Sequence, residues 1–246
     1  MHPINFLLRP FHMHLRRNTG LPAAFLPQYK SDLARMKQNS RGFEVFPEGY
    51  YEVGEHPEPW GSAECRFAAK HIARVHPTEI LDIGSYRLFI LGLLGDYKVT
   101  TIDVRRREQA TANETVVVSD AKQLALPDKS FDTVTALCAI EHFGLGRYGD
   151  EYDETGDLKA VREFIRVLKP GGRLVFSIPF TRGHAAIAFN AHRIYTQQMV
   201  RDFCAGLTPE GEEYYSIELA RPCSFEEVTS APTKWDIYLG CWRKGA

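Results

Sequence analysis

The sequence predicts an α/β fold in which helices cover both faces of a doubly wound, mostly parallel sheet of seven strands. Three observations lead to this prediction. Short β-branched runs alternate with helical patterns from Pro77 onward, as in parallel sheets with crossover helices. Polar residues follow several of these runs directly. The length of 246 residues is enough for one such domain to bury a sizeable core.

The composition is that of an ordinary globular protein, with 44% hydrophobic and 25% charged residues. A net charge of −1 creates no overall field toward DNA or RNA, so neither is an expected partner. No apolar run approaches the roughly 18 residues that a membrane span requires. The five cysteines are scattered without a CxxC pair, which favours reduced thiols and a cytoplasmic location.

We predict an N-terminal extension over residues 1–63 and one domain over residues 64–246. The extension is irregular, with a single helix expected around residues 29–38. Residues 1–20 mix apolar side chains with arginines, and a basic amphipathic segment of this kind can lie on a membrane surface. Packing against the domain is the alternative. The oligomeric state stays open.

The helices and strands of the domain are predicted from the spacing of apolar residues and from the prolines and glycines that end each run. A helix is expected from residue 62 until Pro77, with Phe67 and Ile72 on its apolar face. Later helices are expected over residues 157–169 and 196–206. Strands are expected at 79–83, 98–104, 114–120, 131–139, 172–180, 213–220 and 234–242. The last two form a C-terminal β-hairpin, and the order is Rossmann-like.

Acidic residues stand where successive strands end. Asp82 and Gly84 close the first strand, Asp103 the second and Asp120 the third. In doubly wound sheets, ligands bind at the carboxyl ends of the strands. One aspartate at such an end is often a helix cap or a turn former. Several at consecutive strand ends predict a ligand site instead.

At these positions the chain resembles the class I S-adenosylmethionine-dependent methyltransferases, from about residue 64 to about residue 220. The stretches that carry the resemblance are EILDIGS, TIDV, SDAKQLALPDKSFDTV, REFIRVLKPGGRLVFSIP and NAHRIYTQQMVRDF. Within that family, EHFGLGRYGDEYDETGD and FNAHRIY are similar to a little-characterised branch of methyltransferase-like proteins. The resemblance implies S-adenosylmethionine as the cofactor.

The resemblance also implies roles for individual residues. Asp103 would bind the ribose, and Asp120 the adenine amino group. Ala121 would offer its backbone N–H to the adenine ring. The other implied cofactor residues surround the methionine part, with Asp82 ordering the loop: Asp82, Gly84, Ser85 and Leu137.

Tyr86 stands where nucleotide-binding loops usually have a second glycine. In dinucleotide enzymes that glycine makes room for a pyrophosphate, which S-adenosylmethionine lacks. Tyr86 could point away from the cofactor or cover its methionine tail. The same loop lacks the GxGxxG register of an NAD(P) dehydrogenase, although the run of Arg105, Arg106 and Arg107 could grip a 2′-phosphate. A solvated helix start is the commoner reason for such a run.

Methyl transfer needs alignment of donor and acceptor, and a hydroxyl acceptor also gains from a general base. We name His142, Glu141 and His192 as candidate catalytic residues. A structural hydrogen bond is the alternative role for each histidine. A metal site of the Glu-x-x-Glu-His type, which some methyltransferases have here, lacks its first carboxylate because Cys138 takes that position. Asp150, Asp153 and Asp157 on the following loop could bind Mg²⁺ or Ca²⁺ if they converge, and a solvated acidic loop is the alternative. We expect no metal.

The glycine-rich loop GLGRYGD can shape itself to a ligand, and an arginine fork suits a carboxylate or phosphate. We expect Arg147, Tyr148, Asn190 and Arg193 to form the acceptor pocket. The sequence thus predicts methyl transfer to a small polar molecule, such as the hydroxyl of a sugar or glycan precursor. The alternative is a non-catalytic methyltransferase-like module that binds a partner as a scaffold.

Overall fold

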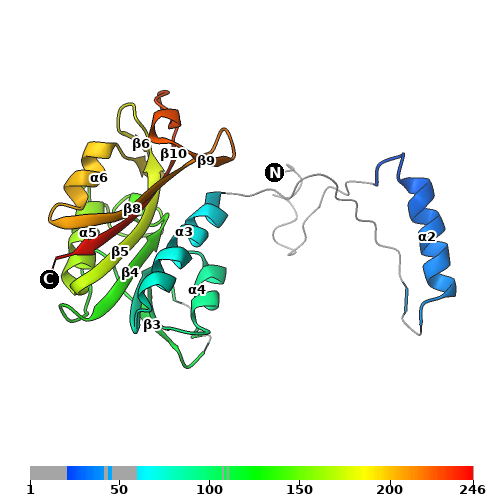
Figure 1. Ribbon diagram of the computed structural model, residues 1–246, viewed down its shortest axis with the longest axis horizontal. Helices are drawn as coiled ribbons and strands as arrows, with labels where there is room; N and C mark the ends of the chain where they lie inside the picture. Colours follow the sequence, from blue (N-terminus) through cyan, green and yellow to red (C-terminus); the bar gives the residue numbers. More distant parts are fainter. Residues whose placement is uncertain (1–20, 42–43, 46–59, 107, 110, 246) are drawn as a thin grey trace. The chain divides into compact units, whose positions relative to one another are not determined.

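The computed structural model describes residues 21–41, 44–45, 60–106, 108–109 and 111–245 (Figure 1). The chain divides into two units, Met1–Pro57 and Glu58–Ala246. The first contains helix α2 (Leu26–Gln38), which matches the helix expected in the extension. The segment expected to touch a membrane, residues 1–20, lies outside the described residues.

The second unit is built on one mixed sheet of eight strands, in the order β3-β2-β1-β4-β5-β10-β8-β9. Strands β3, β2, β1, β4 and β5 run parallel, and β10 pairs antiparallel with both β5 and β8. The bounds are β1 Glu79–Ile83, β2 Lys98–Asp103, β3 Glu114–Val118, β4 Phe131–Leu137, β5 Leu168–Phe180, β8 Leu207–Ser216, β9 Arg221–Cys223 and β10 Asp236–Lys244.

The expectation of an α/β fold with a C-terminal hairpin is confirmed, with one correction. The sheet has eight strands rather than seven, because β9 adds to the edge of β8 within the connection that leads to β10. This strand has only three residues and contains Pro222, so no period-2 pattern marks it in the sequence.

Helices cover both faces of the sheet. The helical elements of this unit are α3 Trp60–Val75, α4 Arg87–Leu93, η2 Ile140–His142, α5 Gly156–Val167, α6 Gln197–Phe203 and η3 Phe225–Glu227. A short separate hairpin consists of β6 (Ala186–Ala188) and β7 (His192–Ile194). Among the described residues, no helix is both long and apolar enough to cross a bilayer.

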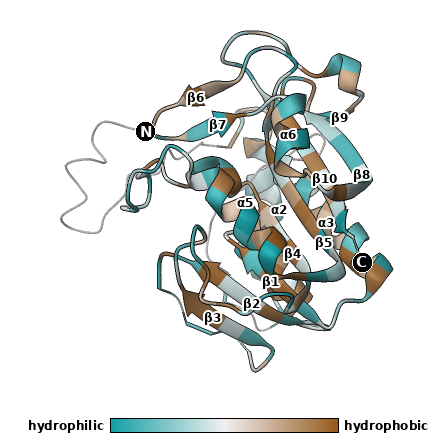
Figure 2. Ribbon diagram, turned by 90° about the vertical axis from the view of Figure 1, so that its left-hand side faces the viewer, coloured by the Kyte–Doolittle hydropathy of each residue, from teal (hydrophilic) through white to brown (hydrophobic). Residues whose placement is uncertain are grey.

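Neighbouring residues of one strand face opposite cores. In β5, Leu174 and Phe176 join the core that includes Val161 and Phe164 of α5, whereas Val175 joins the core that includes Phe67 of α3. The central strands are accordingly hydrophobic on both faces, as their colour in Figure 2 shows. Burying one such large apolar side chain contributes about 1.5–3 kcal/mol to stability.

This topology places the carboxyl ends of four parallel strands at one edge of the sheet. β1 ends next to Gly84, β2 ends at Asp103, β3 ends shortly before Asp120, and β4 ends at Leu137. Residues separated by dozens of positions in the chain therefore come together, as the sequence predicts.

Candidate cofactor and acceptor site

Two neighbouring pockets lie at this edge. The cofactor pocket, as we call the first, is lined by Ile83, Gly84, Ile102, Asp103, Val104, Arg105, Ser119, Asp120, Ala121, Cys138, Ala139, His142, Phe143, Gly144, Tyr148 and Asp150. The acceptor pocket is lined by Trp60, Gly84, Ser85, Tyr86, Leu137, Cys138, Glu141, His142, Arg147, Pro179, His192, Trp235 and Ile237. Gly84, Cys138 and His142 line both pockets, so the two are contiguous.

The loop after β1 turns sharply at Gly84, whose φ is 69°. A Cβ there would lie 3.3 Å from the Cβ of Ala139, so glycine suits both the backbone and the space. Buried Asp82 braces this loop: its Oδ1 accepts a hydrogen bond from the Thr135 hydroxyl at 2.7 Å, and its Oδ2 accepts one from the Ser85 N–H at 3.3 Å. Asp82 thus sits beneath the loop and does not line the cofactor pocket.

Ser85 and Leu137 lie on the acceptor side of the loop. The Leu137 N–H donates to the Ser85 Oγ at 3.1 Å, which ties the end of β4 to the loop after β1. Both residues line the acceptor pocket and neither lines the cofactor pocket. The sequence analysis placed them among the cofactor residues, and the structure puts them at the boundary between the two pockets.

The Asp103 carboxylate is held by Arg105. It accepts hydrogen bonds from Arg105 Nε at 3.0 Å, Nη2 at 2.9 Å and the backbone N–H at 2.8 Å. The Asp103 carboxylate raises the pKa of the Arg105 guanidinium. That guanidinium also lies 4.8 Å from the ring centre of Tyr148. Arg105 is therefore part of the pocket wall and not merely a solvated helix start.

Asp120 and Ala121 complete the far side of the cofactor pocket, after β3. Asp120 accepts the Lys122 N–H at 2.9 Å through Oδ1, and its Oδ2 lies 3.4 Å from Lys122 Nζ. Ala121 is buried against Leu124. Together with Gly84 and Asp103, they bring four of the residues named for the cofactor onto one pocket.

Tyr86 turns away from the cofactor pocket. Its hydroxyl donates to Glu64 Oε2 of α3 at 2.6 Å, and its ring lies so close to Gly61 that a Cβ there would come within 3.3 Å of it. Of the two orientations considered from the sequence, the structure has the one that leaves the cofactor pocket clear. The missing second glycine is therefore no obstacle, and the ring forms part of the acceptor pocket.

His142 joins the two pockets. Its Nδ1 lies 2.6 Å from the carbonyl oxygen of Ala191 and 3.2 Å from Arg147 Nη1. Because so short a contact with a carbonyl oxygen needs a hydrogen between the two atoms, we assign the hydrogen of the ring to Nδ1. The Nε2 is then the acceptor, 3.6 Å from Glu141 Oε1. Burial lowers the pKa of His142 to about 4, which leaves its imidazole neutral near pH 7.

Two buried carboxyl groups stand behind the acceptor pocket. Glu141 is 2% exposed, and burial raises its pKa to about 8. Its Oε2 has no hydrogen-bond partner among the described residues. Glu64 is fully buried, and its Oε1 accepts a hydrogen bond from the Cys138 thiol at 2.7 Å. Burial also raises the pKa of Glu64.

The sequence analysis missed Glu64. Its helix is recognised from the sequence by the apolar face that contains Phe67 and Ile72. The available signal was an acidic residue three positions before Phe67, on the same apolar face of a helix. An acid in that position is buried, and a buried acid needs a partner or a function.

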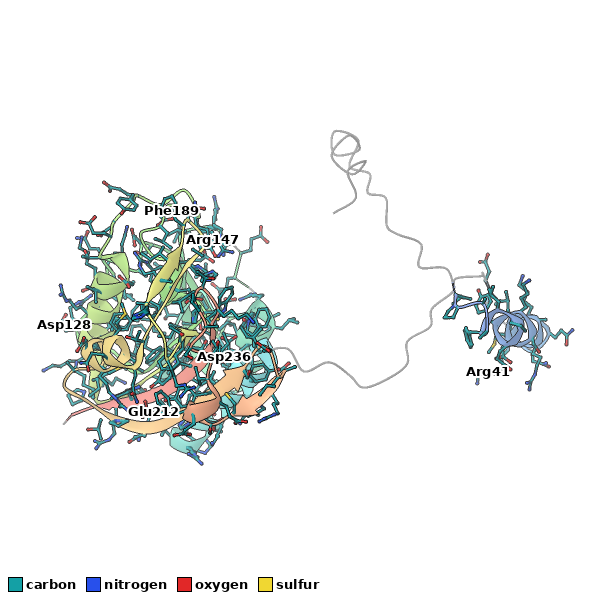
Figure 3. The ribbon with its side chains drawn as sticks, turned by 90° about the horizontal axis from the view of Figure 1, so that it is seen from above. Arg41, Asp128, Arg147, Phe189, Glu212 and Asp236 are labelled. Carbon is teal, nitrogen blue, oxygen red and sulfur yellow. The ribbon has the colours of Figure 1, made fainter. Side chains whose placement is uncertain are left out.

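Of the remaining catalytic and acceptor-site candidates, some line one of the two pockets and others line neither. His192 lines the acceptor pocket with its ring 4.5 Å from that of Trp235, and Arg147 lines it as well. Arg147 donates to the Ala191 carbonyl oxygen at 2.9 Å, beside the β6–β7 hairpin that carries Phe189 (Figure 3). Tyr148 lies in the cofactor pocket instead of the acceptor pocket, which corrects its expected place.

Arg193 and Asn190 line neither pocket, contrary to expectation. Arg193 is 5% exposed, donates to the Phe143 carbonyl oxygen at 2.7 Å and lies 3.6 Å from Asp157 Oδ2. Its guanidinium is thus used to hold the loop after η2 against α5. Asn190 is exposed in the turn between β6 and β7. Both corrections arise because adjacent residues of a strand or turn point in different directions.

The three aspartates considered as metal ligands are engaged within the protein. Asp150 accepts from the Gly144 N–H at 3.2 Å, Asp153 pairs with Lys159 at 2.7 Å, and Asp157 accepts from the Tyr195 hydroxyl at 2.9 Å. In the part of the chain that the structure describes, no three or more histidine, cysteine or acidic side chains have the arrangement of a metal site.

Comparison with known proteins places the chain in a family. Residues 93–218, just over half of the chain, match the family described as "Caenorhabditis protein of unknown function, DUF268". The chain belongs to the DUF268 family. The matched region runs from the end of α4 to β8 and includes the ends of β2, β3 and β4, and therefore most of both pockets.

A characterised relative shares part of this region. The ubiquinone/menaquinone biosynthesis C-methyltransferase UbiE of Pseudomonas paraeruginosa is 33% identical over 122 residues, which are 49% of this chain and 43% of that protein. The UbiE protein of Pseudomonas aeruginosa matches to the same extent. The match spans less than half the length of these relatives.

Solved structures show the same fold over most of the chain. The 1,6-didemethyltoxoflavin-N1-methyltransferase of Burkholderia thailandensis, with bound S-adenosylhomocysteine, has a TM-score of 0.57 at 15% identity and covers 94% of each chain. The [4+2]-cyclase SpnF has a TM-score of 0.54 at 20% identity and covers 88% of this chain and 94% of its own. The fold of this DUF268 protein is therefore that of the class I S-adenosylmethionine-dependent methyltransferases.

Proposed function

We propose that this protein binds S-adenosylmethionine in the cofactor pocket and transfers its methyl group to a small polar molecule in the acceptor pocket. The observation that carries the proposal is the contiguity of the two pockets at the carboxyl edge of the sheet. One contains Gly84, Asp103, Asp120 and Ala121 in the order that the resemblance implies, and it shares His142 with the other. The curated relatives, named as methyltransferases, support the same activity.

The residues present fit this cofactor. Asp103 would accept hydrogen bonds from the ribose hydroxyls, and Asp120 one from the adenine amino group. Gly84 lets the backbone approach the methionine part closely. When bound, the cofactor supplies an electrophilic methyl group on a positively charged sulfur. The chain itself supplies alignment, exclusion of water by buried walls, and a place for the acceptor proton.

The acceptor proton would go to the Glu141–His142 pair. Neutral His142 presents Nε2 toward Glu141, and its Nδ1 is held by the Ala191 carbonyl oxygen, so the ring orientation is set before an acceptor arrives. His192 faces the same pocket from β7. Arg147 at the pocket edge would meet an anionic or polar part of the acceptor. The hydroxyl of a sugar or glycan precursor is the acceptor that the sequence suggested.

A second candidate is a scaffold module that binds a partner without catalysis. SpnF, titled a [4+2]-cyclase, shares the fold at a similar TM-score, so the fold alone does not decide the reaction. The retained acids at the strand ends favour cofactor binding over a scaffold.

Calorimetric titration with S-adenosylmethionine and S-adenosylhomocysteine tests the proposal. We expect micromolar binding that Asp103→Ala weakens by about 100-fold, because two hydrogen bonds to a charged group contribute roughly 3 kcal/mol together. Asp96→Ala is the matched control: this exposed aspartate lies just before the other end of β2. Absence of binding in the folded wild-type protein would reject the enzyme and leave the scaffold.

A further inference from the structure

We propose that the acceptor group is an amine, which enters the acceptor pocket as an ammonium ion and is bound by the Glu141 carboxylate among the rings of Trp60, Tyr86 and Trp235. This inference rests on the proposed function and deepens it by naming the chemical class of the acceptor. It departs from the hydroxyl acceptor that the sequence suggested.

The charge balance of the pocket is the first argument. Glu64 and Glu141 are both at least 98% buried, yet neither forms an ion pair with a lysine or arginine in the described part of the chain. The donors to Glu64 are a hydroxyl and a thiol, which carry no charge. Buried carboxylates are normally paired with a cation. With its pKa raised to about 8, Glu141 is mostly protonated near pH 7 in the empty pocket, and a cationic ligand would supply the charge that lets it ionise.

The second argument is the pair of unsatisfied atoms. Glu141 Oε2 and His192 Nε2 are buried without a hydrogen-bond partner among the described residues, and both residues line the acceptor pocket. The His142 Nε2 is a third acceptor on the same wall, because its Nδ1 carries the hydrogen. With the hydrogen of His192 assigned to Nδ1, these atoms are acceptors without donors, which fits a ligand group with several N–H bonds; an ammonium ion has three.

The aromatic lining is the third argument. Trp60, Tyr86 and Trp235 come from α3, the turn before α4 and the segment before β10, and all three line the pocket. The faces of such rings attract cations, tryptophan most strongly. Arg147 also borders the pocket, but it is exposed and donates to the Ala191 carbonyl oxygen, so water and that carbonyl attenuate its charge.

The reaction balances with Glu141 as the base. The ammonium ion gives one proton to the Glu141 carboxylate and becomes a neutral amine. The nitrogen lone pair then forms a bond to the methyl carbon while the carbon–sulfur bond breaks and its electron pair stays on sulfur. Burial raises the pKa of Glu141, as does the charge of Glu64, while Arg147 lowers it; His142 and Cys138 are the other titratable groups against it. A pKa of about 8 suits exchange of a proton with an amine.

The test compares two ligands of one shape, benzylamine and benzyl alcohol, which differ in charge at neutral pH. Their binding is followed by tryptophan fluorescence of the full chain, with and without saturating S-adenosylhomocysteine, since two of the three tryptophans line the pocket. We expect benzylamine to bind at least tenfold more tightly. Glu141→Gln should remove this preference, and Glu151→Gln, at an exposed position outside both pockets, should retain it.

Three results would overturn the inference: equal or undetectable binding of the two ligands to the wild-type protein, a preference that survives Glu141→Gln, or a Glu141→Gln protein that loses S-adenosylhomocysteine binding. The last result would assign the carboxylate to the cofactor. The comparison of benzylamine with benzyl alcohol on the wild-type protein tests the inference even if the Glu141→Gln protein does not fold. Calorimetry on the same samples separates the two proposals, because cofactor binding without amine preference rejects the inference alone.

Discussion

The two pockets differ in whether their acidic side chains have basic partners within the chain. In the cofactor pocket the acids have partners close by in the chain: Arg105 holds Asp103, and Lys122 follows Asp120. At the acceptor pocket, Glu141 in the wall and Glu64 behind it come from elements far apart in the chain, and neither has a lysine or arginine partner among the described residues. The acids of the first pocket are paired within the chain, whereas we propose that a ligand brings the partner for the acid of the second. That difference separates recognition of a common cofactor from selection of a particular acceptor.

The largest expected effect concerns the stability cost of Glu141. Burial raises the pKa of Glu141 to about 8 in the folded state, from an ordinary value of 4.5. Between these values the folded state binds more protons than the unfolded state, so this group stabilises the fold less as pH rises from 4.5 to 8. Glu141→Gln should therefore be more stable than wild type by about 4 kcal/mol at pH 8 and by only about 1 kcal/mol at pH 5.

Thermal unfolding of both proteins at pH 5 and pH 8 measures this difference. The His142 imidazole, whose pKa is lowered to about 4, loses its contribution as pH falls from 6.5 toward 4. This loss occurs in both proteins and cancels in the comparison. A variant less stable than wild type at pH 8 would show that Glu141 has a partner inside the fold, and the contrast between the pockets would disappear.

Tyr86→Phe should have a moderate effect that is confined to the acceptor pocket, which tests the difference between the two pockets. Because the Tyr86 hydroxyl donates to Glu64 and the ring lines the acceptor pocket, its loss should leave S-adenosylhomocysteine affinity within about twofold. It should reduce methyl transfer several-fold and lower stability by about 1–2 kcal/mol, since a buried acceptor loses its donor. Calorimetry and unfolding measure the two effects. A tenfold loss of cofactor affinity would instead put Tyr86 in the cofactor pocket.

The smallest expected effect is a gain in cofactor affinity, caused by Arg105→Ala. Arg105 occupies the Asp103 carboxylate that the ribose would use, so this ion pair must open for the cofactor. The Arg105 side chain is 64% exposed, and exposed pairs contribute about 0–1 kcal/mol. Arg105→Ala should therefore tighten S-adenosylhomocysteine binding by up to about fivefold in calorimetry. Lys98→Ala, at the exposed start of β2, is the control. Weaker binding of Arg105→Ala would mean that Arg105 contacts the cofactor.

Most of the fold could be predicted because its determinants are local. Period-2 runs between breakers mark the parallel strands, the apolar face of α5 marks its helix, and Pro77 ends the helix before β1. Strand ends meet at one edge in any doubly wound sheet, so Gly84, Asp103 and Asp120 could be assigned to one site from the order of elements. The short strand β9 has no such local signal.

The sequence by itself therefore determined the sheet, its ligand-binding edge and the residues of the cofactor pocket, all of which follow from periodicity and chain order. Only the tertiary structure decided the acceptor pocket. Tyr86, Glu141 and Trp235 meet at this pocket, with Glu64 behind Tyr86, because α3 and β10 pack beside β4 and β5, and no spacing along the chain encodes that meeting. Tertiary packing also turned Tyr86 toward Glu64 and Arg193 toward Asp157. The direction and burial of a side chain depend on neighbours that are distant in the sequence. These two properties determine which acidic residues have no lysine or arginine partner among the described residues.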